Sequence, residues 1–185
     1  MELNWYRSYP SKTDLATIPE RRPRVVDALP IIELTRYDYK TVAELNSLQT
    51  DTGWPMEQPG FCMLEWDVAL DPWQRKLFGS IALQEPREVL VGPYRFWDTW
   101  SCWINNDGSG PSTDGRPIQE GEPRTDSFGL GCIYIPNSVL HEFLVQMDKF
   151  GFSDGTFGKW YHEKYGKARV TWDVHPQHLH EYESD

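Results

Sequence analysis

The sequence has few cysteines, and none of them belongs to a C-x-x-C pair. The three that are present, Cys62, Cys102 and Cys132, lie far apart along the chain. They therefore predict neither a disulfide framework nor a zinc site built on paired thiolates. A chain without a disulfide framework fits a reducing compartment, so we expect a cytoplasmic protein.

Long apolar runs and excess positive charge are also missing. No run reaches the length that crosses a bilayer, and the N-terminus lacks the basic-then-apolar profile of a signal peptide, so we expect no membrane partner. With 18 Lys and Arg against 28 Asp and Glu, the net charge is −10, which argues against a globally basic nucleic-acid binder. Brief contact with nucleic acid through a local basic arm stays open, and Lys12, Arg21, Arg22 and Arg24 form such an arm.

The composition of the sequence is that of a folded domain. It is 39% hydrophobic and 14% aromatic over 185 residues, which favours one globular domain. The order of its patterns predicts an α/β fold with a mainly parallel sheet flanked by helices. We expect a polar arm over 1–24, the folded domain over 25–180 and a tail over 181–185. Expected strands lie within 24–34, 61–70, 88–94, 132–135 and 169–174, and expected helices within 37–48, 72–83, 137–147 and 157–165.

Two acidic residues end the most strand-like run of the chain. Glu65 and Asp67 follow the apolar segment 61–64, and the alternation of a strand would place both on one face. Unpaired carboxylates are costly to bury, so these two should reach water, a basic group or a divalent cation. An ordinary solvated strand end is the alternative, because short motifs are weak evidence.

Three of the five histidines lie close together near the C-terminus. His178 and His180 share a parity, so an extended backbone would present both on one side. Imidazole binds borderline divalent cations, and its protonated form binds phosphate. We predict that Asp67 and one of these two histidines reach the same pocket, although a polar tail without a role is equally compatible with the pattern.

The segment 97–127 interrupts the alternation of strands and helices. Trp97 and Trp100 open it, and they fit either a helical stripe packed on the core or a stacking wall over a ligand. Gly129 and Gly131 follow this segment and allow a close approach of the backbone to another group. Asp154 lies just ahead of the last helix, where it fits an N-cap or a general base.

Taken in order, these segments resemble a short glycosyltransferase of the GT-A fold, of the kind found in phages and actinobacteria. The resemblance covers about residues 25–180 and rests on order and spacing. Its parts are the strand ending in Glu65-Trp66-Asp67, the strand 89–94, the element 126–136, Asp154 at a helix start and the run His178-Leu179-His180.

The resemblance implies a single-domain, Rossmann-like GT-A fold that moves a sugar from a nucleotide-sugar to an acceptor hydroxyl. It implies that Mn²⁺ or Mg²⁺ lies on the donor diphosphate, held by Asp67, Glu65, His178 and His180. It also implies that Asp154 deprotonates the acceptor. The substrate-binding residues that it suggests are Trp66, Trp97, Trp100, Asp126, Gly129 and Gly131.

The acceptor stays open among a hydroxymethylated pyrimidine in phage DNA, a protein and a glycan, and a phage origin would place the protein in the host cytoplasm. Two other functions fit the same residues. One is a non-catalytic GT-A-like module that binds a glycan or a partner. The other is a metal-dependent hydrolase that uses the acidic and histidine residues.

Overall fold

The computed structural model describes residues 1–9, 29–47, 58–105, 115–147 and 151–179. Four helices lie in this part of the chain, and they are α1 (Arg36–Ser47), α2 (Pro72–Ala82), α3 (Asn137–Gln146) and α4 (Asp154–Tyr165). The strands of the main sheet are β1 (Trp5–Tyr9), β2 (Ile31–Glu33), β3 (Gly60–Glu65), β5 (Leu90–Val91), β10 (Arg124–Thr125), β12 (Cys132–Pro136) and β13 (Ala168–Val170). None of the described helices is long and apolar enough to cross a bilayer.

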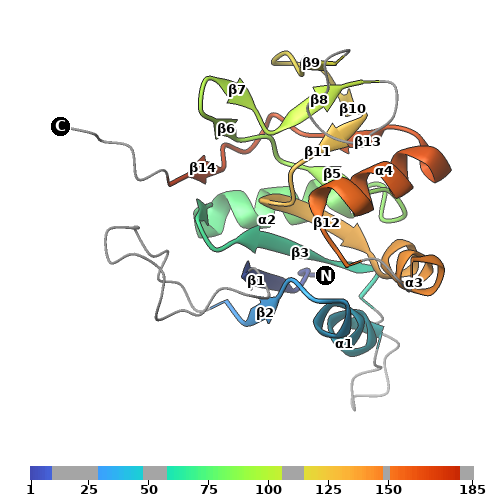
Figure 1. Cartoon of the computed structure of the whole chain (residues 1–185). Helices are drawn as coiled ribbons and strands as arrows, with labels where there is room; N and C mark the ends of the chain where they lie inside the picture. Colours follow the sequence, from blue (N-terminus) through green and yellow to red (C-terminus); the bar gives the residue numbers. More distant parts are fainter. Residues whose placement is uncertain (10–28, 48–57, 106–114, 148–150, 180–185) are drawn as a thin grey trace, which may run out of the picture.

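The main sheet has seven strands in the order β10-β13-β5-β12-β3-β1-β2 (Figure 1). The pairs β1–β2, β1–β3 and β5–β13 are parallel, whereas β12 is antiparallel to both β3 and β5, and β10 is antiparallel to β13. Five strands therefore run one way and two run the other. The expectation of an α/β fold with a mainly parallel sheet is confirmed at this level.

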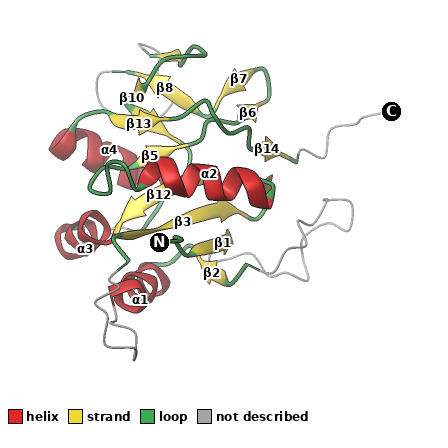
Figure 2. Ribbon diagram, turned by 180° about the vertical axis from the view of Figure 1, so that it is seen from behind, coloured by secondary structure: helices red, strands yellow, loops and turns green. Residues whose placement is uncertain are grey.

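Helices cover both faces of the sheet. Alternate residues of β3 divide between the faces, and Phe61 and Met63 join a cluster with α1, α3 and α4. Cys62 and Leu64 join a second cluster on the opposite face with Phe78 of α2. Figure 2, seen from behind, shows α2 alone in front of the sheet. Because β3 is buried on both faces, its sequence is a continuous apolar run.

Three small sheets accompany the main sheet. They are formed by β4 (Val68–Ala69) with β14 (Gln177–His178), by β6 (Arg95–Phe96) with β7 (Thr99–Trp100), and by β8 (Cys102–Ile104) with β9 (Arg116–Pro117) and β11 (Ser127–Phe128). The tryptophans at 97 and 100 therefore lie on a hairpin, and the expected alternative of a helical stripe is wrong.

Local capping explains where two of the helices begin. The Asp71 side chain accepts hydrogen bonds from the N–H groups of Trp73 and Gln74 at 2.9 and 3.0 Å, and Pro72 is the first residue of α2, as expected. Helix α4 is capped by Ser153 in a capping box with Thr156. Asp154 is thus the first residue of α4 and is not its cap.

The N-terminal segment differs from the expectation. Of the polar arm predicted over 1–24, residues 5–9 instead form β1, an interior strand between β2 and β3, and residues 10–24 lie outside the described part of the chain. The pattern hid this strand because Arg7, at its centre, is charged and yet only 2% exposed. Of the two runs considered for the first strand, Ile31–Ile32 lies in β2, and Val25–Val26 lies outside the described residues.

Candidate active site

The candidate site lies at the carboxyl-terminal end of β3. Glu65 is the last residue of β3, a turn holds Trp66 and Asp67, and β4 follows directly. Along the chain, the next strand of the main sheet after β1 is β2, whereas the next one after β3 is β5. The neighbouring parallel strands β1 and β3 therefore lead toward opposite edges of the sheet. Open α/β sheets bind ligands in the crevice formed at such a point.

Arg7 fixes the turn that carries Asp67. From β1, its Nη1 group donates to the carbonyl oxygen of Glu65 at 2.6 Å and to that of Val68 at 3.0 Å. A buried guanidinium that bridges two backbone carbonyls sets the shape of the turn between them. Arg7 is therefore a positioning residue that the sequence did not reveal.

Asp67 and His178 meet where β14 lies beside β4. His178 is paired with Val68 in the register of these strands, and the N–H of Leu179 donates to the Asp67 carbonyl at 2.8 Å. The His178 Nε2 atom lies 3.2 Å from Asp67 Oδ2. The predicted proximity of Asp67 to one of the two histidines is thus confirmed for His178, whereas His180 lies outside the described residues.

Tyr94, which follows β5, joins this group from the neighbouring strand. Its hydroxyl is hydrogen bonded to the Glu65 side chain, and its ring stacks on His178 at 5.4 Å and 6° between the planes. Burial raises the pKa of Tyr94 well above its usual range, and the carboxylates of Glu65, Asp154 and Asp67 raise it further. All three acidic side chains therefore lie near enough to Tyr94 to act on its hydroxyl electrostatically.

The two glycines make room for this phenol. A Cβ atom on Gly131 would lie 2.4 Å from Tyr94 Cε1, and one on Gly129 would lie 2.7 Å from the Tyr94 hydroxyl oxygen. The close approach expected at these glycines is thus an approach to Tyr94. Both glycines thus have a packing role, and their expected role in binding substrate stays a prediction.

The electrostatics of Glu65 show how crowded the site is. Burial raises the pKa of Glu65 well above its usual range, and the neighbouring carboxylates of Asp154 and Asp67 raise it further. The hydrogen bond with Tyr94 offsets part of this increase. Like charges that share a site disfavour ionisation of all of them, and a cation placed among them would remove this cost.

Asp154 faces this group from the start of α4. Burial raises its pKa, while hydrogen bonds from its own N–H group and from that of Leu130 lower it. The residue is nevertheless exposed, so a ligand can reach it from solvent. A carboxylate with a raised pKa at an accessible position can accept a proton from a bound hydroxyl.

The described residues hold no group of three or more His, Cys, Asp or Glu side chains close enough to form a metal cage. The set around Asp67 still fits Mg²⁺ or Mn²⁺, because Asp67 Oδ1 is buried without a hydrogen-bond partner in the described part of the chain. Cations that act on phosphates often take one or two protein carboxylates and complete their coordination with phosphate oxygens and water. The imidazole of His178 also suits Mn²⁺.

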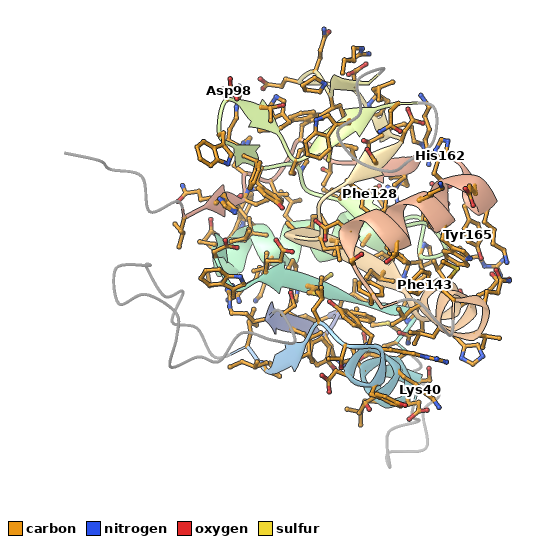
Figure 3. All side chains as sticks on the ribbon, viewed as in Figure 1. Lys40, Asp98, Phe128, Phe143, His162 and Tyr165 are labelled. Atoms are coloured by element: carbon orange, nitrogen blue, oxygen red, sulfur yellow. The ribbon has the colours of Figure 1, made fainter. Side chains whose placement is uncertain are left out.

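Asp126, expected to contact substrate, is engaged elsewhere. It is 3% exposed, and its Oδ2 atom accepts a hydrogen bond from the Asn105 N–H at 3.0 Å. His162, labelled on α4 in Figure 3, and Lys167 each lie 3.4 Å from its carboxylate. The buried carboxylate is thus held within the protein through its Oδ2 atom, so no contact seen here supports the expected role of Asp126 in binding substrate.

The tryptophans occupy three different environments. Trp66 is half-buried in the turn beside Asp67. Trp97 is 61% exposed at the tip of the β6–β7 hairpin, with φ at +61°, a conformation that bulky residues rarely adopt. Next to it, Phe96 meets the His178 ring edge-on at 5.4 Å, so Trp97 and Phe96 extend an aromatic flank from the site. Trp100 lines a cavity on the far side of His178.

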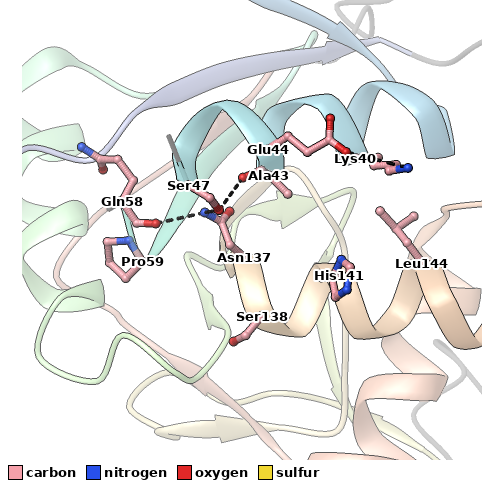
Figure 4. A pocket seen from close by; sticks show the side chains of 10 residues that line it. All are labelled: Lys40, Ala43, Glu44, Ser47, Gln58, Pro59, Asn137, Ser138, His141 and Leu144. Atoms are coloured by element: carbon pink, nitrogen blue, oxygen red, sulfur yellow. Dashed lines mark hydrogen bonds and ion pairs between the residues drawn. The ribbon is translucent and has the colours of Figure 1, made fainter. Parts of the chain in front are cut away.

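A larger cavity, of about 880 Å³, lies away from these groups. It is formed by α1 and α3 around Lys40, Asn137 and His141 (Figure 4). It also includes Pro59, which precedes β3, whereas Glu65 ends that strand. About 17 Å of extended strand therefore separates this cavity from the carboxylates.

No family model matches the sequence, and no curated protein matches it. Among solved structures, the crystal structure of A197 from STIV is similar to this chain, with a TM-score of 0.53 at 12% sequence identity. The similarity covers 96% of this chain and 86% of that chain. At such low identity it concerns the fold alone, and it agrees with a single α/β unit over most of the sequence.

Proposed function

We propose that the protein is a glycosyltransferase that moves a sugar from a nucleotide-sugar to an acceptor hydroxyl. The observation that carries the proposal is the contact of His178 with Asp67 at the end of β3, beside Glu65. The carboxylate of Asp154 lies near enough to this group to raise the pKa of Glu65. Glu65 and Asp67 lie at the carboxyl end of β3, the end of the strands at which open α/β sheets bind nucleotides. The GT-A resemblance of the sequence assigns the same residues to donor and acceptor.

In this proposal Asp67 and His178 hold Mn²⁺ or Mg²⁺, which would neutralise the charge of the donor diphosphate. The crowded carboxylates fit this role, because a cation would relieve the repulsion that raises the pKa of Glu65. Arg7 keeps Asp67 in place by fixing both ends of its turn. Tyr94 keeps Glu65 in place through its hydroxyl.

Asp154 acts in this proposal as the general base. The acceptor hydroxyl gives its proton to the Asp154 carboxylate while its oxygen forms a bond to the anomeric carbon of the donor sugar. The bond between that carbon and the diphosphate oxygen breaks, and the nucleoside diphosphate leaves with the electron pair. A sugar hydroxyl is a weak nucleophile, so a base at this position is worth a factor of about 10² to 10⁴ in rate.

The test separates the base from the metal ligand. A thermal-shift screen of nucleotide-sugars with and without Mn²⁺ identifies the donor, since a ligand at 100 times its Kd stabilises the fold by about 2.7 kcal/mol. Asp154→Asn should then reduce turnover about 10²- to 10⁴-fold with nearly unchanged donor binding. Asp67→Asn should instead weaken donor binding when metal is present.

Each outcome points to a different function. If no nucleotide-sugar stabilises the protein, the proposal is contradicted and a binding module is favoured. Metal-dependent cleavage of a phosphoester without sugar transfer would identify a hydrolase. Near-native turnover of Asp154→Asn, together with donor binding, would keep the transferase and remove Asp154 as its base.

A further inference from the structure

A second cavity adjoins the candidate active site through His178. The β6–β7 hairpin and the segment 172–179 enclose about 460 Å³, a volume typical of small-ligand sites. Figure 1 shows β14 beside this hairpin, above the end of β3. The residues that line it are Pro93, Arg95, Trp100, Trp172, Val174, His175, Pro176, Gln177, His178 and Leu179.

Two indole rings form a corner of this cavity. The rings of Trp100 and Trp172 lie 5.0 Å apart, with their planes at 83°. The Trp172 Nε1 group donates to the Glu122 carbonyl at 2.8 Å, which fixes the orientation of that ring. Flat amphipathic rings held in this way suit the apolar faces of a sugar ring.

The charge of the cavity is opposite to that of the neighbouring carboxylate group. Arg95 is the permanently charged residue of its lining, and no carboxylate lines it. The Arg95 guanidinium lies 4.1 Å from the centre of the Trp100 ring. It makes one long hydrogen bond of 3.4 Å, to the Asp98 carbonyl, and the residue is exposed. A guanidinium presented on an aromatic face is suited to bind a carboxylate or phosphate through two parallel hydrogen bonds.

We propose that this cavity is the acceptor site and that it takes a sugar unit bearing a carboxylate or a phosphate. The proposal rests on the proposed glycosyl transfer. We place the donor at the carboxyl ends of β1 and β3, because open α/β sheets bind nucleotides where neighbouring strands lead to opposite edges of the sheet. The acceptor sugar packs on Trp100 and Trp172, its anion binds Arg95, and its reacting hydroxyl points past His178 toward the carboxylates.

The probes are methyl glucuronide and glucose 6-phosphate, with the neutral methyl glucoside as their matched control. Binding to the full chain is followed by quenching of tryptophan fluorescence. We expect at least one acidic sugar to bind about 10-fold or more tightly than the neutral one, since a hydrogen bond to a charged group contributes that much. The acidic sugar that binds tells a carboxylate-bearing acceptor from a phosphorylated one.

Variants locate the binding site. Arg95→Gln should remove the preference for the acidic sugar and leave binding of methyl glucoside within about twofold, which also shows that the hairpin is intact. Arg95→Lys should retain part of the preference. Trp172→Ala should weaken the binding of both the acidic and the neutral sugar. Arg87→Gln, at an exposed arginine outside the cavity, is the matched control and should change nothing.

Equal binding of acidic and neutral sugars, or an unchanged preference in Arg95→Gln, would overturn the proposal. Displacement of the acidic sugar by the nucleotide-sugar would also overturn it, because the cavity would then belong to the donor. Failure of the acceptor assignment can be told apart from failure of the proposed glycosyl transfer. If the nucleotide-sugar binds and acidic sugars do not, only the acceptor assignment fails, whereas the reverse result removes the transferase and leaves an acidic-sugar site.

Discussion

At the scale of single residues, Glu65 combines burial with two neighbouring carboxylates. Its carboxyl pKa lies well above the usual range, so between the usual and the raised value the folded protein binds more protons than the unfolded chain. Stability contributed by this group is therefore greatest at low pH and falls as pH rises through that window. Gathering acidic side chains at this site therefore lowers the stability of the fold at neutral pH.

Glu65→Gln should raise stability at neutral pH, because the amide keeps an acceptor for the Tyr94 hydroxyl and removes the buried charge. The melting temperature should increase by roughly 2–4 °C for each 1 kcal/mol gained. The difference from the unmodified protein should vanish as pH falls toward about 4, where the carboxyl is protonated in both states. Melting curves between pH 4 and 8 measure this, and a variant less stable at pH 7 would show that the ionised carboxylate is favourably paired.

Two glycines give opposite expectations for the same substitution. Gly131→Ala places a Cβ atom 2.4 Å from Tyr94 Cε1 and should cost about 1–3 kcal/mol of unfolding free energy. Gly155→Ala is the control, because a Cβ there meets nothing within 4 Å and the residue lies in α4, where alanine should gain about 0.5–1 kcal/mol. Urea unfolding measures both, and a neutral Gly131→Ala would mean that Tyr94 can move without loss.

At the scale of elements, the turn between β3 and β4 depends on a strand from the other end of the chain. Arg7→Met removes the donor to the carbonyls of Glu65 and Val68 and should cost about 2–4 kcal/mol, since both oxygens lose their buried partner. Arg7→Lys should lose less, because an ammonium can still donate to one of them. Urea unfolding and Mn²⁺ affinity are the two measurements. A loss below about 0.5 kcal/mol would show that the turn holds its shape without Arg7.

The same elements show what could be predicted from sequence. Helix α2 was predicted because Asp71 and Pro72 act locally, and the meeting of Asp67 with His178 was anticipated from strand parity and the scarcity of histidines. Strand β1 was missed because the partner of Arg7 lies in a turn some sixty residues away, and local patterns carry no trace of such a pair. Tyr94 was missed as a site residue for the same reason, since only the sheet order brings it to Glu65.

At the scale of the whole molecule, stability is distributed unevenly. Strand β3 is paired on both sides and residues 61–64 are fully buried, whereas the flanks of the site are two-stranded sheets, β4–β14 and β6–β7. Short two-stranded sheets open more readily than a central strand. The ligand-facing part can thus open while the main sheet stays folded.

Hydrogen exchange should display this difference. Amides of β3 should exchange at least about 100-fold more slowly than those of β6, β7 and β14. Mn²⁺ should slow exchange in β4 and β14, because the contact between Asp67 and His178 connects these two strands. It should have no such effect in Asp67→Asn. Mass spectrometry of peptic fragments measures both effects. Uniform exchange across the sheets would show that the molecule opens only as a whole.

The stacking of His178 on Tyr94 also gives the site its own spectroscopic signal. The centre of this imidazole ring lies 5.4 Å from the centre of the nearly parallel Tyr94 ring and 5.4 Å from the centre of the Phe96 ring, which is steeply inclined to it. Aromatic ring currents should move the resonances of the carbon-bound imidazole protons away from those of the other histidines, and the protein has only five in total. A one-dimensional proton spectrum of the unlabelled protein would then follow the occupancy of Asp67 and His178 directly, with paramagnetic Mn²⁺ broadening this one pair of lines first.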